Sequence, residues 1–277
     1  MASLQFGSRI QAATYAQGRV RPPSKLINTV LDYLREGCKP NENGLWPFAV
    51  DVGAGSGQST FLLKDHFTNI LGVDISEAQI DEANKCNQFP NISFKVSPAE
   101  SIPVENNSVS LVTASQCVHW FDLPKFYQEL DRMLVPGGIF AAIFYTAAPI
   151  KTTKDAKMTQ VLIAEMAEKA FQDLADMGLW DQRAIDVHNR YFTELPLPFK
   201  ASMKHDFICS IDYTCENYLN YIKSWSSYNK LIDQDPEKAK LFIDNIIEKL
   251  KSILGTEDVL PVQIQVDFNF FVAMSRK

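Results

Sequence analysis

The residues that decide the fold read DVGAGSG, at positions 51–57. They follow a short apolar run at 47–52 (PFAVDV), which predicts a buried strand, and they lead into 57–67 (GQSTFLLKDHF), which predicts a helix. Glycines at such a turn let the backbone bend sharply and approach a ligand closely. Because open α/β sheets bind ligands at the carboxyl ends of their strands, this turn is the candidate binding loop.

Two familiar glycine loops do not fit this turn. The dinucleotide fingerprint G-x-G-x-x-G/A fails at its third glycine position, which is Gln58. A phosphate-binding P-loop fails as well, because no G-K-[ST] follows. The spacing is instead G-x-G-x-G, with the acid Asp51 two residues before the first glycine.

Strands and helices alternate along the first half of the chain. Further short apolar runs predict strands at 70–74, 92–96, 109–114 and 139–144. Ser76 caps an expected helix, with Gln79 three residues later, and Pro124 opens another that ends at 136–138 (PGG). Such alternation implies a parallel sheet with right-handed crossover connections.

The second half is expected to cover the mouth of this sheet. Helices are predicted at 151–180, 216–231 and 238–254, a sixth strand at 205–211, and a long last strand at 262–275 that inserts antiparallel. We therefore expect one α/β domain over 1–277. Its parts are an N-terminal lid and first helix (1–46), a cofactor-binding core (47–146), a cap and substrate region with the sixth strand (147–261), and the terminal strand (262–277).

Composition and charge exclude several classes of protein. The 277 residues are 46% hydrophobic and 22% charged, with 12 Gly and 14 Pro, so neither a disordered nor a collagen-like chain fits. A net charge of −6 disfavours nucleic acid as the main partner. No apolar run reaches the roughly 18 residues that cross a bilayer. The five cysteines suggest neither disulfides nor a zinc site, so we expect a cytoplasmic protein without membrane partner or metal. Residues 1–23, with three Arg and no acid, leave a mitochondrial leader as the alternative.

Acidic and small residues follow the second and third strands. Asp74 ends the second strand and could accept two hydrogen bonds from the hydroxyls of a ribose. Ile75 beside it could pack against an adenine. The turn 97–103 (SPAESIP) follows the third strand and could close the adenine pocket with a small residue and an acidic or backbone contact.

Five elements, in this order and spacing across 47–144, resemble the class I S-adenosylmethionine-dependent methyltransferases: DVGAGSG, the acid ending the second strand, SPAESIP, VSLVTA (109–114) and PGG. The resemblance implies a Rossmann-like fold with a seven-stranded, mostly parallel sheet and a helical cap. It also implies S-adenosylmethionine as cofactor, with S-adenosylhomocysteine as its product. The residues expected to bind the cofactor are Asp51, Gly53, Ala54, Gly55, Gly57, Asp74, Ile75, Ala99, Glu100, Gln116 and Tyr15. Tyr15 could equally be a core residue.

A narrower resemblance lies in 115–122 (SQCVHWFD), which is similar to the AVHWFD-type segment of the trans-aconitate methyltransferase-like group of small-molecule enzymes. Arg19 falls near that group's RPxYP pattern, which Val20 and Pro22 break. The stretch 221–231 (YIKSWSSYNKL) resembles the group's substrate-side helix.

Several side chains are candidates for acceptor binding, each with a plainer alternative. His119 could act as a general base or only shape the pocket. Trp120 could form a pocket wall or attract the sulfonium by a cation–π contact. Arg19 or Arg21 could anchor an acidic substrate, because the arginine fork matches a carboxylate, or lie on the surface.

Three aromatic residues, Tyr221, Trp225 and Tyr228, fall on one face of the helix predicted at 216–231. Such a face either contacts substrate or belongs to the core. The residues assigned to the substrate are Arg19, Arg21, His119, Trp120, Trp225 and Tyr228.

The function that follows is methyl transfer from S-adenosylmethionine to a small molecule, with O-methylation of a carboxylate favoured. N-methylation of a small amine is the alternative reaction, and a catalytically inactive cofactor-binding protein of the same fold is the other alternative. A macromolecular substrate is disfavoured, because no docking domain and no N/D-P-P-Y/F motif after the fourth strand is visible in the sequence. We expect a monomer or a weak homodimer.

Overall fold

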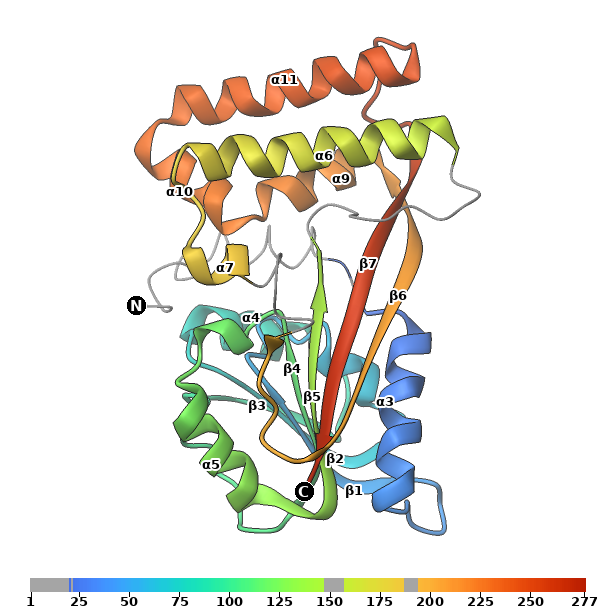
Figure 1. Ribbon diagram of the computed structural model, residues 1–277, viewed down its shortest axis with the longest axis vertical. Coiled ribbons are helices and arrows are strands. Elements are labelled where there is room, and N and C mark those ends of the chain that lie inside the picture. Colours follow the sequence, from blue (N-terminus) through green and yellow to red (C-terminus); the bar gives the residue numbers. More distant parts are fainter. Residues whose placement is uncertain (1–19, 21, 147–156, 187–193) are drawn as a thin grey trace.

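The computed structural model describes residues 20, 22–146, 157–186 and 194–277. Its strands are β1 (Trp46–Val52), β2 (Phe67–Asp74), β3 (Ile92–Val96), β4 (Val109–Ser115), β5 (Leu134–Tyr145), β6 (Ala201–Thr214) and β7 (Gln263–Arg276). They form one seven-stranded sheet in the order β3-β2-β1-β4-β5-β7-β6 (Figure 1). All neighbouring pairs are parallel except the two that β7 makes with β5 and β6. The predicted fold class, a mostly parallel sheet with an antiparallel last strand, is confirmed.

The helices fall into those beside the sheet and those above it (Figure 1). Beside the sheet lie α3 (Ser24–Gly37), α4 (Glu77–Cys86), α5 (Leu123–Met133) and the short 3-10 helices η1 (Thr60–Leu63) and η2 (Val118–Trp120). Above it lie α6 (Met158–Asp176), α7 (Gln182–Asp186), α9 (Cys215–Lys223), α10 (Ser226–Gln234) and α11 (Pro236–Leu254). We call α6, α7, α9, α10 and α11 the cap.

Helices cover both faces of the central strands β1, β4 and β5, whose successive side chains point to opposite sides of the sheet and are mostly buried. On one face, Leu34 of α3 and Ile80 of α4 join the first apolar core. On the other face, Phe126 and Leu130 of α5 pack in a second core with strand residues such as Val112. Burial on both sides explains why the strands read as nearly continuous apolar runs.

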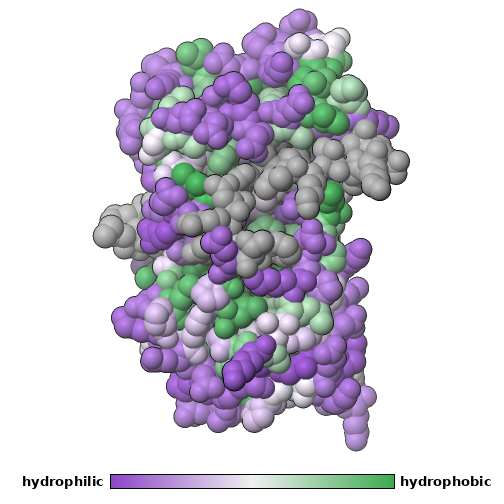
Figure 2. All heavy atoms as spheres, in the orientation of Figure 1, coloured by the Kyte–Doolittle hydropathy of each residue, from purple (hydrophilic) through white to green (hydrophobic). Residues whose placement is uncertain are grey.

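The two last strands carry the cap. β6 and β7 pair over 14 residues each, from Ala201 opposite Arg276 to Thr214 opposite Gln263. Only residues 270–276 of β7 also pair with β5, so the other ends of both strands rise towards the cap (Figure 1). The chain forms α9, α10 and α11 between these strands. On the face seen in Figure 2, most of the surface of the sheet and cap regions is hydrophilic, and apolar residues show as separate patches.

Two details of the predicted core are wrong. The stretch 57–67 forms only η1, because hydrogen bonds such as Leu62 N to Ser59 O (3.1 Å) and His66 N to Leu63 O (3.0 Å) span three residues. The turn 136–138 is part of β5, which starts at Leu134 and shifts register before it pairs with Leu111 of β4.

The helix predicted at 216–231 is also wrong, because it breaks into α9 and α10 at Trp225. Trp225 has an extended backbone (φ −66°, ψ 138°), and its ring packs 5.7 Å from that of Trp180 and 6.4 Å from that of Phe171. Asn229 Nδ2 donates to Trp225 O (2.9 Å), which satisfies a carbonyl at the break. The three aromatic residues therefore do not share a face of one helix. None of the helices in the described part of the chain is long and apolar enough to cross a membrane.

Candidate active site

A hollow opens at the carboxyl ends of β1 to β4, with about 830 Å³ of empty space including its mouth. We call it the larger hollow, to distinguish it from a smaller one described below. Its walls come from the loop after β1, the β2–α4 junction, the turn after β3 and the segment after β4: Val52, Gly53, Gly55, Asp74, Ile75, Ser76, Gln79, Ser97, Pro98, Ala99, Glu100, Ser115, Gln116, Cys117, Trp120 and Phe121.

Glycine is required at the start of the loop for two reasons. Gly53 has a positive φ of 68°, a conformation that other residues rarely adopt. A Cβ at this position would also lie only 2.6 Å from Cys117 Sγ. The glycine thus lets the loop after β1 pack directly against the segment after β4.

The Cys117 thiol lies in the wall of the larger hollow and donates to Val52 O (3.1 Å). Burial, and next the negative charges of Asp51 and Asp74, raise the pKa of this thiol well above its ordinary value. The sulfur therefore stays protonated at neutral pH and is a poor nucleophile.

The carboxylate of Asp74 is fixed by the backbone around it. Its Oδ2 accepts from Gly55 N and its Oδ1 from Ser76 N, both at 2.9 Å. Burial raises the pKa of Asp74, and these backbone hydrogen bonds oppose that shift. Each oxygen keeps capacity to accept a further hydrogen bond from a ligand hydroxyl.

Asp51 has a different environment, because it is almost completely buried. Its Oδ2 accepts from Thr60 Oγ1 (2.6 Å) and its Oδ1 from Thr113 Oγ1 (2.7 Å). Burial raises the pKa of Asp51 to about 6 against the two hydroxyl hydrogen bonds. The Asp51 side chain, which belongs to β1, therefore connects β1 to η1 and to β4 through these two hydrogen bonds.

A smaller hollow, with about 380 Å³ of empty space, lies on the other side of the glycine loop. Its lining includes Val20, from the N-terminal segment, and Tyr145, at the end of β5. Gln116 lines both hollows and has a positive φ of 56°, which is strained for a residue with a side chain. Gln116 Nε2 donates to Tyr145 O (2.9 Å), which holds this side chain against the end of β5.

The segment after β4 that contains His119, Trp120 and Phe121 forms η2 and part of the wall of the larger hollow. Trp120 lines the larger hollow, and the His119 ring lies beside it at a centroid distance of 4.8 Å. Arg183 of α7 lies over the Trp120 ring, with its guanidinium carbon 4.4 Å from the centroid. Asp181 orients that guanidinium through hydrogen bonds of 2.9 and 3.0 Å. The cap thus contacts the wall of the hollow.

The structure brings most of the predicted cofactor residues together. Those lining one or both hollows are Gly53, Ala54, Gly55, Asp74, Ile75, Ala99, Glu100 and Gln116, with Trp120 from the substrate set. As far as the described residues form them, neither hollow is lined by Asp51, Gly57, His119, Trp225 or Tyr228. Tyr15, Arg19 and Arg21 lie outside the described residues.

Sequence reasoning missed several lining residues. Cys117 and Phe121 sit in the quoted SQCVHWFD segment but were not singled out, although their position after β4 places them there. Gln79 was expected only to complete a helix cap, whereas it lines the larger hollow. Tyr145 carries no sequence signal beyond ending a strand.

The chemistry of the hollows fits S-adenosylmethionine. Gln79 Oε1 in the larger hollow and Ser56 Oγ in the smaller one are buried and lack a hydrogen-bond partner in the described structure. An unpaired buried polar atom costs about 1–3 kcal/mol, so such atoms suit a ligand with polar groups. Ile75 is 52% exposed beside Asp74, which offers an apolar surface next to a carboxylate, as an adenosine requires. Among the described residues, no group of three or more His, Cys, Asp or Glu is placed to hold a metal ion.

Comparisons with known proteins show the family to which the chain belongs. Residues 50–142 match the family model described as a methyltransferase domain. A methyltransferase-like protein of Schizosaccharomyces pombe is 34% identical over 214 residues, which cover 76% of this chain and 76% of the relative. A protein of Saccharomyces cerevisiae described as a probable S-adenosylmethionine-dependent methyltransferase is 24% identical, over 98% of this chain and 97% of its own length.

A solved structure from Anaeromyxobacter dehalogenans, assigned as a type II methyltransferase, superposes with a TM-score of 0.70. It is 25% identical, and the match covers 93% of this chain and 97% of that one. The strand order, the glycine loop and these similarities lead to the same conclusion. The chain belongs to the methyltransferases, in the class I family that has a Rossmann-like fold and depends on S-adenosylmethionine.

Proposed function

We propose that the chain methylates a carboxylate of a small molecule, with the adenosyl group of S-adenosylmethionine in the larger hollow and its methionine part towards the smaller one. One observation carries this placement. The two hollows share four lining residues, Gly53, Gly55, Ser115 and Gln116, so a single extended ligand can occupy both.

Six of the predicted cofactor residues have a stated role in this proposal. The Asp74 carboxylate accepts hydrogen bonds from the ribose hydroxyls, and Ile75 and Ala99 flank the adenine. Gly53 and Gly55 allow the backbone to lie along the methionine part. Glu100 lines the same hollow, but its Oε1 accepts from Asp122 N (2.8 Å), so its role is to hold the adenine wall.

The chemistry needs little from the protein beyond position. The cofactor supplies a methyl group on a positively charged sulfur, which is already electrophilic. The chain aligns the acceptor with that methyl group, and alignment alone can supply much of the acceleration. The neutral Cys117 thiol is a weak competitor for the methyl group, because its raised pKa keeps the sulfur protonated.

The surroundings of the smaller hollow favour a small acceptor. Tyr145 lines this hollow, and its ring lies 6.5 Å from the ring of Tyr221 in α9, so the cap packs against a residue of the hollow's wall. The resemblance of the HWFD segment to small-molecule enzymes of the trans-aconitate methyltransferase-like group supports the same substrate class. Trp225 and Tyr228 belong to this cap, and we propose that they shape the acceptor side through its packing.

Preference for a carboxylate rests on the N-terminal arginines. Val20 lines the smaller hollow, and Arg19 and Arg21 are its neighbours in the sequence. An arginine fork matches a carboxylate, and an ionised carboxylate needs no base. Methylation of a small amine is the second candidate, with His119 as the general base beside Trp120.

We further propose a cytoplasmic protein that acts as a monomer or weak homodimer, without nucleic acid or membrane as partner. All five cysteines are free, which fits a reducing compartment. The net charge of −6 does not favour a polyanion.

Incubation with methyl-labelled S-adenosylmethionine and a metabolite extract tests the acceptor class. We expect label in a small product that mild base releases, as from a methyl ester, and weaker labelling by Arg19→Ala or Arg21→Ala than by the surface control Arg35→Ala. A base-stable product would favour the amine and make His119→Asn the next variant. Label retained with macromolecules would contradict a small acceptor, and cofactor binding without transfer to any fraction would favour the inactive binding protein.

A further inference from the structure

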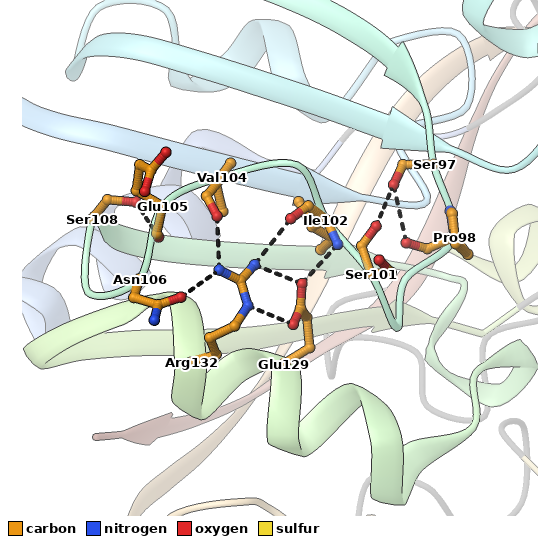
Figure 3. A network of polar contacts seen from close by, with 10 residues as sticks. All are labelled: Ser97, Pro98, Ser101, Ile102, Val104, Glu105, Asn106, Ser108, Glu129 and Arg132. Atoms are coloured by element: carbon orange, nitrogen blue, oxygen red, sulfur yellow. Dashed lines mark hydrogen bonds and ion pairs between the residues drawn. The ribbon is translucent and has the colours of Figure 1, made fainter.

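The stretch between β3 and β4 has no regular secondary structure, since residues 97–108, all described, form neither helix nor strand. Its first residues, 97–100, line the larger hollow. Backbone in such a stretch must find hydrogen-bond partners outside a helix or sheet ladder. Two side chains of α5, Glu129 and Arg132, supply them (Figure 3).

Arg132 binds the carbonyl side of this stretch. Its Nη2 donates to Ile102 O (3.0 Å), and its Nη1 donates to Val104 O (2.7 Å) and to Asn106 Oδ1 (2.8 Å). One guanidinium therefore holds two backbone carbonyls and one side chain of the irregular stretch, as Figure 3 shows. A lysine ammonium at this position could not reproduce that planar arrangement of donors.

Glu129 binds both the backbone and the arginine. Its Oε1 accepts from Ile102 N (2.7 Å), and its two oxygens pair with Arg132 Nη2 (2.7 Å) and Nε (2.8 Å). The Glu129 residue is buried, and the hydrogen bond from Arg132 lowers the pKa of its carboxyl, which keeps it ionised. Ile102 thus has both its N–H and its C=O bound by one ion pair.

The other end of the stretch is held as well. Ser97 N donates to Asp74 O (3.0 Å), and Ser97 Oγ donates to Ser101 O (2.7 Å). Glu100 accepts from Asp122 N, the N-cap of α5. The wall 97–100 therefore lies between two fixed points, the end of β2 and the length of α5.

We propose that Glu129 and Arg132 are positioning residues for the cofactor: through Ile102 and Val104 they hold the turn 97–100 at the distance from Asp74 that lets it recognise the edge of the adenine ring. The inference rests on the adenosyl placement proposed above. Neither residue lines the hollow, so their effect reaches the ligand only through the turn. An exposed ion pair on a helix contributes little, whereas this one also holds the buried Ile102 N–H through Glu129 and the Val104 carbonyl through Arg132; Ile102 O keeps a second hydrogen bond, from Val104 N.

Selectivity for adenine tests the proposal. Calorimetry would measure the affinity of wild type, Arg132→Lys and Glu129→Gln for S-adenosylhomocysteine and for S-inosylhomocysteine, in which a keto group replaces the adenine amino group. We expect Arg132→Lys to weaken the binding of S-adenosylhomocysteine about tenfold, which is about 1.4 kcal/mol, and that of S-inosylhomocysteine about twofold. If Arg132→Lys fails to fold, Glu129→Gln, which keeps the shape of the side chain, should show the same selective weakening of S-adenosylhomocysteine binding.

The matched control is Arg35→Lys, which alters an exposed ion pair with Asp32 on α3, away from the hollows, and should change neither affinity. Equal weakening of both ligands would indicate general destabilisation and overturn the proposal, as would no weakening of either. A wild-type protein that binds both ligands equally would overturn it too. If Asp74→Asn also leaves S-adenosylhomocysteine binding intact, the adenosyl placement itself is wrong. If Asp74→Asn abolishes binding and Arg132→Lys does not, only this inference is wrong.

Discussion

The guanidinium of Arg183, in α7 of the cap, lies 4.4 Å from the ring centroid of Trp120, which lines the larger hollow. Asp181 holds Arg183 in place, and the same hydrogen bonds lower the pKa of Asp181 to about 2. This contact joins the cap to the wall of the larger hollow. If the cofactor binds there as proposed, we expect the cap to influence how fast the product leaves.

Removal of this contact should speed release of S-adenosylhomocysteine. A partly exposed cation–π pair contributes about 1 kcal/mol, so we expect Arg183→Ala to raise the dissociation rate about fivefold. Stopped-flow fluorescence of the tryptophans would measure this rate. The control is Arg35→Ala, which removes a cation over Trp46 at 5.4 Å, away from both hollows. Equal dissociation rates in Arg183→Ala and wild type would show that the contact does not restrain the ligand.

Substitution of Gly53 by alanine should lower the free energy of unfolding by more than the positive φ of this position alone explains. Gly44→Ala offers the comparison, because Gly44 also has a positive φ (78°) but open space around it. We expect Gly44→Ala to lower the free energy of unfolding by about 1 kcal/mol. Gly53→Ala should lower it by about 3 kcal/mol and weaken S-adenosylhomocysteine binding, because its Cβ would overlap Cys117. Urea unfolding and calorimetry measure both effects, and equal costs at the two positions would refute the close packing described here.

Stability should depend on pH through Asp51. Its pKa is about 6 in the folded chain and 3.8 as the ordinary value, so the folded state binds this proton more tightly. The proton's contribution to stability is complete below about pH 4 and is lost as the pH rises through about 6. Asp51→Asn cannot titrate. Wild type should therefore lose up to about 3 kcal/mol of unfolding free energy relative to Asp51→Asn between about pH 4 and pH 7. A difference that stays constant across urea titrations at several pH values would contradict the raised pKa.

Much of the site could be predicted, because a glycine or an acidic residue directly after a short apolar run marks the end of a strand. Asp74 and Gly53 sit where short apolar runs stop, and parallel strands bring those ends to one edge of the sheet. Glu129 could not be found this way. It lies in an amphipathic helix where an acid normally faces solvent, and only the partner Ile102, far away in sequence, reveals why it is buried.

The cap was harder to predict, because its helices are shaped by packing between distant segments. Helical periodicity runs on through 221–231, yet Trp225 leaves the helix so that its ring can pack with Phe171 and Trp180. The sequence around Trp225 does not indicate which distant residues its ring packs against. The strand β6 is longer than the predicted sixth strand (205–211) for a related reason, since it extends as far as β7 pairs with it.

The central claim is that Asp74 binds the ribose of the cofactor. Calorimetric titration of S-adenosylhomocysteine into wild type, Asp74→Asn and Glu77→Gln tests it most directly, because Glu77 is an exposed acid three residues further on that does not line the hollow. Two charge-assisted hydrogen bonds are at stake, so we predict one site in wild type, a loss of affinity of about a hundredfold in Asp74→Asn, and little change in Glu77→Gln. Binding by Asp74→Asn that matches wild type would contradict the account.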